Sequence, residues 1–184
     1  VHIADVSHYV KPESEIDKEA YLRAFSIYFP GRVIPMLPEK LSNNLCSLKE
    51  GVDRFTFSVV LETDKEFNIL SNKITKGIIN SNKRFSYEGV EKILRDGKGD
   101  YFNELHVLNQ VAKKQRKARD INGSIEFERS SVSFHVDKSG NPISISKKVP
   151  LDSHKLVEEF MLLANKTVAT KLRKTRSSIF RVHD

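Results

Sequence analysis

The residues with the clearest potential for chemistry in this chain are acidic. Metal-assisted hydrolysis of a phosphodiester needs clustered carboxylates, because the cations must be held close to the scissile phosphate. Asp5 follows a short apolar segment, a reasonable place for a ligand, but it is a single aspartate. Glu158 and Glu159 lie on a predicted helix, where one carboxylate could point inward and would then need a partner. These residues alone do not predict a metal site.

Other catalytic patterns are missing from the sequence. It contains no P-loop, no glycine-rich dinucleotide fingerprint, no HExxH and no CxxC. The six histidines are scattered without the spacing of metal ligands, which favours structural or solvated roles. The pattern of residues therefore predicts no catalytic residue and no metal ligand within this chain.

Aromatic residues suggest a different kind of site. Four of them occupy predicted loops or the ends of predicted elements, where a ring could stack on the bases of a single strand. They are Tyr28, Phe29, Tyr87 and Phe127. Packing in the core remains the alternative for each ring. Basic stripes at residues 113–119 and 166–176 could track phosphates or be solvated helix faces.

Composition limits the class of protein. The 184 residues fit one domain or one large piece of a longer protein, with 39% hydrophobic and 30% charged residues. The net charge of +7, from 31 basic and 24 acidic residues, favours a polyanionic partner. The single cysteine excludes an internal disulfide and predicts a reducing, cytoplasmic location. No apolar run approaches the roughly 20 residues that span a bilayer, so we expect no membrane partner.

The elements that must position these residues alternate between strand pairs and single helices. We expect strands at residues 1–6, 54–61, 67–79, 131–136 and 143–146, and helices at residues 14–25, 86–94, 101–120 and 152–173. The second and third strands should pair around residues 63–66. The sequence therefore predicts an α+β fold, with a mixed, largely antiparallel sheet and flanking helices.

One segment, residues 28–48, fits neither helix nor central strand. It contains Pro30, Pro35 and Pro38, a glycine and a pair of asparagines among apolar residues. Ordinary connections inside a domain are much shorter. This composition predicts an irregular loop that forms a binding surface or a lid.

Several segments in their order resemble a known family. They are VHIADVSHYVKP, RAFSIYFPGRVIPMLPEKLSNNLCSL, VDRFTFSV, RFSYEGV, NGSIEFE, DSHKLVEEFMLLAN and FRVHD. Together they resemble the catalytic RNB domain of the ribonuclease II and ribonuclease R family, and most closely its bacterial ribonuclease R branch. The resemblance covers essentially the whole chain.

This resemblance implies a processive, metal-dependent 3′-to-5′ exoribonuclease that releases nucleoside 5′-monophosphates from single-stranded RNA. By motif, Tyr28 and Phe127 would be opposing walls of a clamp for the last base, and Tyr87 would help to set the cleavage position. Glu159 would contact the terminal ribose, whose 2′-hydroxyl distinguishes RNA from DNA. Phe134 and Glu158 are the nearest alternatives if the alignment shifts.

The resemblance also implies what lies elsewhere. The family's D-x5-D-x-D-D metal run would precede residue 1, and its catalytic arginine would follow Asp184. Residues 1–184 would then be the central portion of one catalytic domain, truncated at both ends. Magnesium would be bound mostly by ligands outside this chain, and the isolated segment would be inactive. A non-catalytic RNA-binding relative that has lost the metal aspartates remains an alternative.

Overall fold

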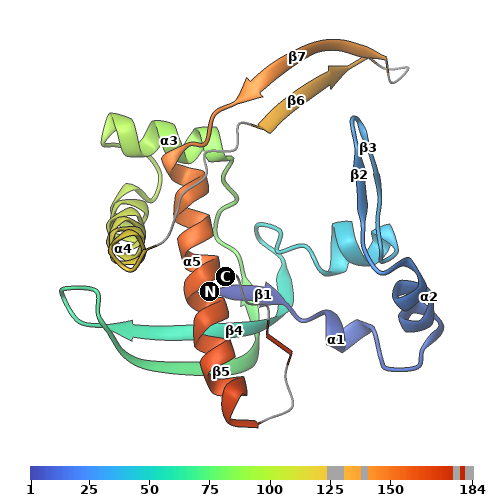
Figure 1. Ribbon diagram of the computed structural model, residues 1–184, viewed down its shortest axis with the longest axis horizontal. Coiled ribbons are helices and arrows are strands. Elements are labelled where there is room, and N and C mark those ends of the chain that lie inside the picture. The colour runs from blue at the N-terminus through green and yellow to red at the C-terminus, as the bar shows by residue number, and fades with distance from the viewer. Residues whose placement is uncertain (124–130, 138–140, 176–178, 181–184) are drawn as a thin grey trace.

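The computed structural model describes residues 1–123, 131–137, 141–175 and 179–180. Its central sheet has three antiparallel strands in the order β1-β4-β5, with β1 at His2–Ala4, β4 at Asp53–Thr63 and β5 at Ile69–Asn80 (Figure 1). β4 pairs with both neighbours, so that Phe57 lies opposite Ile3 on β1 and opposite Lys76 on β5. The predicted α+β fold with antiparallel strands is confirmed, although the described strands form three separate sheets.

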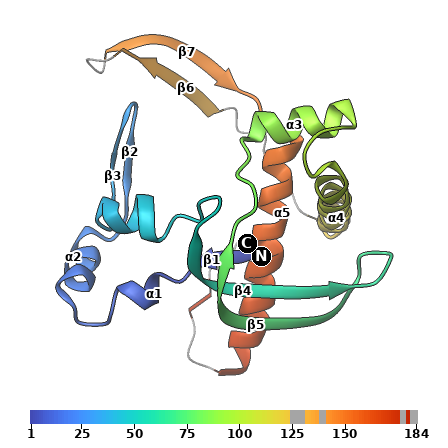
Figure 2. The same ribbon diagram turned by 180° about the vertical axis from the view of Figure 1, so that it is seen from behind.

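The middle of β4 is buried on both faces. Val59 is buried on the predicted apolar face, but Phe57 on the same face is partly exposed. On the opposite face Thr56 and Ser58 are buried and their hydroxyl groups share a hydrogen bond of 3.1 Å. α5, at Asp152–Leu172, packs against β4 and crosses one face of the sheet in both views (Figures 1 and 2). β4 is therefore the central strand of the sheet, and buried side chains lie on both of its faces beside exposed ones such as Phe57.

The helical layer consists of α5 with α3, at Tyr87–Asp96, and α4, at Phe102–Ile121. Its core is made mainly of small and aliphatic side chains, which include Leu105, Val111, Ala112 and Ala164. Leu108 on α4 and Leu172 on α5 are partly exposed. Helical periodicity indicates which face is apolar, but it does not indicate how far the partner helix extends along that face.

Much of the proline-rich segment forms short regular elements, so the prediction of an irregular loop is wrong for that part, while residues 35–38 and 46–48 lie outside helices and strands. β2 at Ile27–Phe29 and β3 at Arg32–Ile34 form a hairpin, and a π-helix, η1, follows at Lys40–Leu45. Pro30 and Gly31 form the turn, where Gly31 has a φ of 71° that favours glycine. β2 ends before Pro30 and β3 lies between Pro30 and Pro35, so neither strand needs a hydrogen bond from a proline.

Other elements agree with the sequence pattern in kind and differ in length. The first strand ends at Ala4, since α1 begins at Val6 and runs to Tyr9. α2 covers Glu15–Arg23, capped by the Ser14 hydroxyl, which accepts a hydrogen bond from the Asp17 N–H. β6 at Ser131–Val136 and β7 at Pro142–Lys148 form a ribbon that leads into α5 (Figure 2), and η2 at Arg173–Thr175 follows α5. Among the described residues, no helix is long and apolar enough to cross a membrane.

Candidate nucleic-acid interface

Tyr28 lies in the middle of β2, in the hairpin that projects to one side of the sheet (Figure 1). Its partner across the hairpin is Val33, and 78% of its surface is exposed. In the described part of the chain this hairpin has only two strands, and little of the Tyr28 side chain is covered by other residues. The ring is therefore free to stack on a ligand, as the wall of a base clamp must be.

Tyr87 is the first residue of α3, directly after the Ser86 hydroxyl that caps the helix by accepting from the Gly89 N–H. Its ring stacks on the imidazole of His154, with centroids 4.0 Å apart and planes 10° from parallel. The residue keeps 42% of its surface exposed. One face of the phenol is thus held by the protein, while the rest is accessible. The sequence singled out Tyr87 but not His154, which lies on α5, far from Tyr87 along the sequence.

Glu159 is the inward carboxylate of the pair on α5. It is 5% exposed, and the Arg119 Nη2 of α4 lies 2.6 Å from its Oε1. Glu158 lies 3.7 Å from the same guanidinium but is largely exposed. The prediction that an inward glutamate needs a partner is confirmed by Arg119, which belongs to the basic stripe at residues 113–119. A carboxylate has several acceptor positions, so this pairing still permits Glu159 to accept a ligand hydroxyl.

The remaining clamp residue is Phe127, which lies outside the described residues. Its alternative, Phe134, is on β6 opposite Ile145 and is partly exposed. The structure therefore leaves the choice between these two phenylalanines untested.

The basic stripe of α4 is partly used for structure. The Lys113 ammonium lies 3.2 Å from the Asp152 carboxylate at the start of α5. Lys114 donates to the Glu66 carbonyl and, at 2.8 Å, to the Asn68 side chain in the turn between β4 and β5. With Arg119 bound to Glu159, at least three of the five basic residues join α4 to its neighbours. These residues therefore have structural contacts, and phosphate binding by the stripe stays a prediction.

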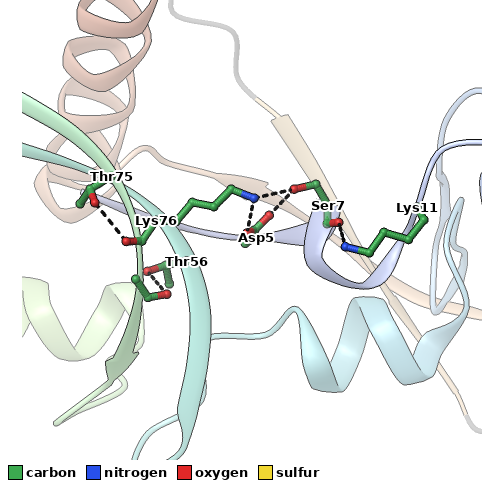
Figure 3. A network of polar contacts seen from close by, with 7 residues as sticks. Asp5, Ser7, Lys11, Thr56, Thr75 and Lys76 are labelled. Atoms are coloured by element: carbon green, nitrogen blue, oxygen red, sulfur yellow. Dashed lines mark hydrogen bonds and ion pairs between the residues drawn. The ribbon is translucent and has the colours of Figure 1, made fainter.

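Asp5 is engaged in a polar network at the end of β1 (Figure 3). It is 7% exposed, accepts a hydrogen bond of 2.5 Å from the Ser7 hydroxyl and lies 3.0 Å from the Lys76 ammonium. These contacts hold the pKa of its carboxyl below the ordinary value. Within the described ranges no group of three or more His, Cys, Asp or Glu side chains could hold a metal ion. The described residues therefore do not fit a magnesium site, and we derive no metal-dependent step from them.

The chain is basic, and accessible aromatic rings lie on separate elements of its α+β fold. These features fit a protein that binds single-stranded nucleic acid better than an enzyme with a P-loop. The family model of the RNB domain matches residues 1–184 of the sequence. The chain therefore belongs to the RNB family, which includes ribonuclease II and ribonuclease R. It is 41% identical to ribonuclease R 2 of Lactococcus lactis, with all of this chain and 29% of that protein covered. The chain thus spans less than a third of this relative.

Solved structures agree with the family assignment. Ribonuclease R of Mycoplasma genitalium in complex with ribose-methylated single-stranded RNA gives a TM-score of 0.92 at 36% identity, covering 100% of this chain and 30% of that chain. The same protein has also been solved with double-stranded RNA, with a TM-score of 0.92 over 99% of this chain and 34% of that chain. Yeast Ssd1, described as a pseudonuclease, shares the fold with a TM-score of 0.75 at 22% identity, over 97% of this chain and 22% of its own.

Proposed function

We propose that this chain is the central portion of the catalytic domain of a 3′-to-5′ exoribonuclease that releases nucleoside 5′-monophosphates. The observation that carries the proposal is the match of all 184 residues to the RNB domain, together with relatives named ribonuclease R. Because the chain spans 29% of one such relative, we assign the activity to the longer protein and not to this segment. The partner is the 3′ end of single-stranded RNA.

Within that protein, the segment supplies the grip on the RNA 3′ end. Tyr28 and Phe127 form the two walls of the base clamp, Tyr87 sets the position of cleavage, and Glu159 accepts from the 2′-hydroxyl of the terminal ribose. The exposure of Tyr28 and the partial exposure of Tyr87 support these roles, since a stacking ring must be reachable. Burial of Glu159 beside Arg119 supports its role, because a fixed, charged acceptor discriminates a ligand hydroxyl strongly.

Magnesium belongs to this proposal as the cofactor of the longer protein, held by carboxylates outside the described residues. We infer that the 184-residue chain alone has no magnesium-dependent nuclease activity. The measurement is the release of nucleoside monophosphate from a 3′-labelled single strand. Appreciable release by this chain would contradict the inference.

The clamp is tested in the full-length protein with Tyr28→Ala and Phe127→Ala. Stacking on a base contributes about 1–3 kcal/mol, so each variant should weaken the affinity for short RNA by about tenfold or more and change the length of the final product. Tyr21→Ala is the matched control, because Tyr21 is an exposed tyrosine on the neighbouring helix α2. If both variants keep the affinity and the final product of the control, the clamp assignment is wrong.

A second candidate is an RNA-binding protein without nuclease activity. The observation that favours it is the fold shared with a protein described as a pseudonuclease, which means that this fold is compatible with the loss of catalysis. The two candidates differ in the residues upstream of Val1. An intact acidic run there together with monophosphate release supports the nuclease, whereas RNA binding without release supports the alternative.

A further inference from the structure

The junction between α3 and α5 fixes the side chain of Tyr87 more tightly than its position at a helix start requires. The Tyr87 ring is stacked on His154 at 4.0 Å. One turn further along α3, the Glu91 Oε2 accepts a hydrogen bond of 3.1 Å from the Ser153 N–H at the start of α5. The starts of α3 and α5 are therefore joined by a hydrogen bond from a backbone N–H to a glutamate side chain and, beside it, a ring stack.

The imidazole of His154 is itself fixed by the backbone of α5. The Leu151 N–H donates to the His154 Nδ1 at 3.2 Å, and the His154 N–H donates to the Leu151 carbonyl at 3.1 Å. Because Nδ1 accepts, the neutral ring carries its proton on Nε2. This reciprocal pair of hydrogen bonds sets the plane of the imidazole, and the imidazole plane then sets the plane of the phenol stacked on it.

We propose that His154 is the positioning residue for Tyr87: it holds the phenol in the orientation in which Tyr87 contacts RNA near the 3′ end. This inference rests on the proposed role of Tyr87. A partly exposed tyrosine at the first position of a helix has several side-chain rotamers available, and the stack selects one of them. It also leaves only the outer face and the edge of the phenol for RNA.

The same contact sets the distance between two RNA-binding residues. His154 and Glu159 lie on the same helix, five residues apart, which corresponds to a rise of about 7.5 Å along α5. The stack on His154 fixes Tyr87 relative to α5, and the ion pair with Arg119 fixes Glu159 relative to α4. Loss of the stack should therefore change where the RNA is cut relative to its terminal ribose, and not only how tightly it is bound.

Two substitutions separate the stack from the helix cap. His154→Asn keeps an acceptor in the position of Nδ1 but removes the ring, whereas His154→Phe keeps a flat ring but removes the acceptor. In the full-length protein, we expect His154→Asn to weaken the affinity for short RNA by about 2- to 10-fold, as the loss of one aromatic pair implies, and to change the length of the final product. His154→Phe, which keeps a stacked ring but loses the hydrogen bond that orients it, should have a smaller effect on both properties than His154→Asn. The reverse pattern, with Phe defective and Asn normal, would overturn the proposal in favour of a pure capping role.

A double substitution provides the second readout. If His154 acts through Tyr87, His154→Asn should have no further effect on the final product when it is combined with Tyr87→Ala. Additive effects of the two changes would overturn the proposal, since His154 would then act independently. A normal final product from Tyr87→Ala alone would refute the proposed role of Tyr87 and, with it, this inference. An altered product from Tyr87→Ala beside a normal one from His154→Asn would refute only the inference.

Discussion

Two regions of the molecule present their RNA-binding candidates in opposite ways. The arm, defined as residues 14–45 with α2, the β2–β3 hairpin and η1, lies on one side of the sheet, and α3 and α4 of the helical layer lie on the other (Figure 1). Tyr28 in the arm is 78% exposed, whereas Glu159 in the helical layer is 5% exposed. The contacts of the helical layer thus hold its candidate RNA-binding side chains in place, whereas the arm leaves its candidate, Tyr28, exposed.

The contacts that stabilise each region explain this difference. In the arm they are local: Arg23 donates to the Pro35 carbonyl at 3.1 Å, and the Met36 N–H donates to the Ser26 hydroxyl at 2.9 Å. In the helical layer they join segments far apart, since Arg119 and Glu159 are separated by 40 residues. A change in the helical layer should therefore affect global stability, while a change in the arm should act locally or on RNA binding alone.

The largest expected effect on stability is that of Arg119→Met. Removal of the guanidinium leaves the buried Glu159 carboxylate without the cation that lies 2.6 Å away. Breaking one side of a buried pair costs about 3 kcal/mol, which should lower the midpoint of thermal unfolding of the domain that contains the pair by several degrees. The measurement is thermal unfolding of the full-length protein.

Lys117→Met is the matched control for this prediction, because Lys117 is an exposed cation on the same helix. It should change the free energy of unfolding by less than about 0.5 kcal/mol. Equal midpoints for the two variants would show that the Arg119–Glu159 pair contributes little to stability. The claim that long-range contacts stabilise the helical layer would then lose its main support.

Removal of a helix cap should have an intermediate effect on stability. One cap lies in each region, so the two variants compare the arm with the helical layer directly. The Ser86 hydroxyl accepts from the Gly89 N–H at 3.1 Å, and the Ser14 hydroxyl accepts from the Asp17 N–H at 3.3 Å. Each serine-to-alanine change should cost about 1 kcal/mol. We expect Ser86→Ala to lower the midpoint of unfolding, and Ser14→Ala to increase hydrogen exchange only in α2, because local opening is governed by local contacts. The same global shift in both variants would contradict this division.

Asp5 lies between the sheet and the arm, and its effect depends on pH. The hydrogen bond from Ser7, followed by that from Lys76, lowers the pKa of its carboxyl from the ordinary value of 3.8. A group with a lowered folded-state pKa stabilises the fold fully above its unfolded-state pKa, and this contribution is lost as pH falls through the folded-state value. The stability difference between the wild-type protein and Asp5→Asn should therefore be constant near neutral pH and shrink below about pH 4.

Unfolding midpoints measured between pH 6 and pH 2.5 test this, with Asp120→Asn as the control at an exposed aspartate. A difference that grows as the pH falls would have the wrong sign for a carboxylate stabilised by Ser7 and Lys76.

The elements were predictable where the signal is local, and the site was predictable only in part. Ser14 and Ser86 mark two helix starts, because a hydroxyl that accepts from the third following N–H needs no information from elsewhere. The hairpin in the arm was missed, since counting prolines does not show that they fall outside two three-residue strands. Sequence reasoning proposed Tyr87 and Glu159 as site residues, which stays a prediction, but it did not indicate their partners His154 and Arg119. Pairs between distant helices depend on packing that no local pattern encodes.

The smallest expected effect on stability is that of Tyr28→Ala, and it is the sharpest test of the comparison. With 78% of its surface exposed, Tyr28 buries little apolar area, so its removal should change the free energy of unfolding by less than about 0.5 kcal/mol. The same variant should lose about tenfold or more in affinity for short RNA, because the ring is available for a base. Chemical unfolding and RNA titration of one protein sample measure both quantities. A large loss of stability would mean that the ring is packed against other parts of the full-length protein, and the arm would then be fixed like the helical layer.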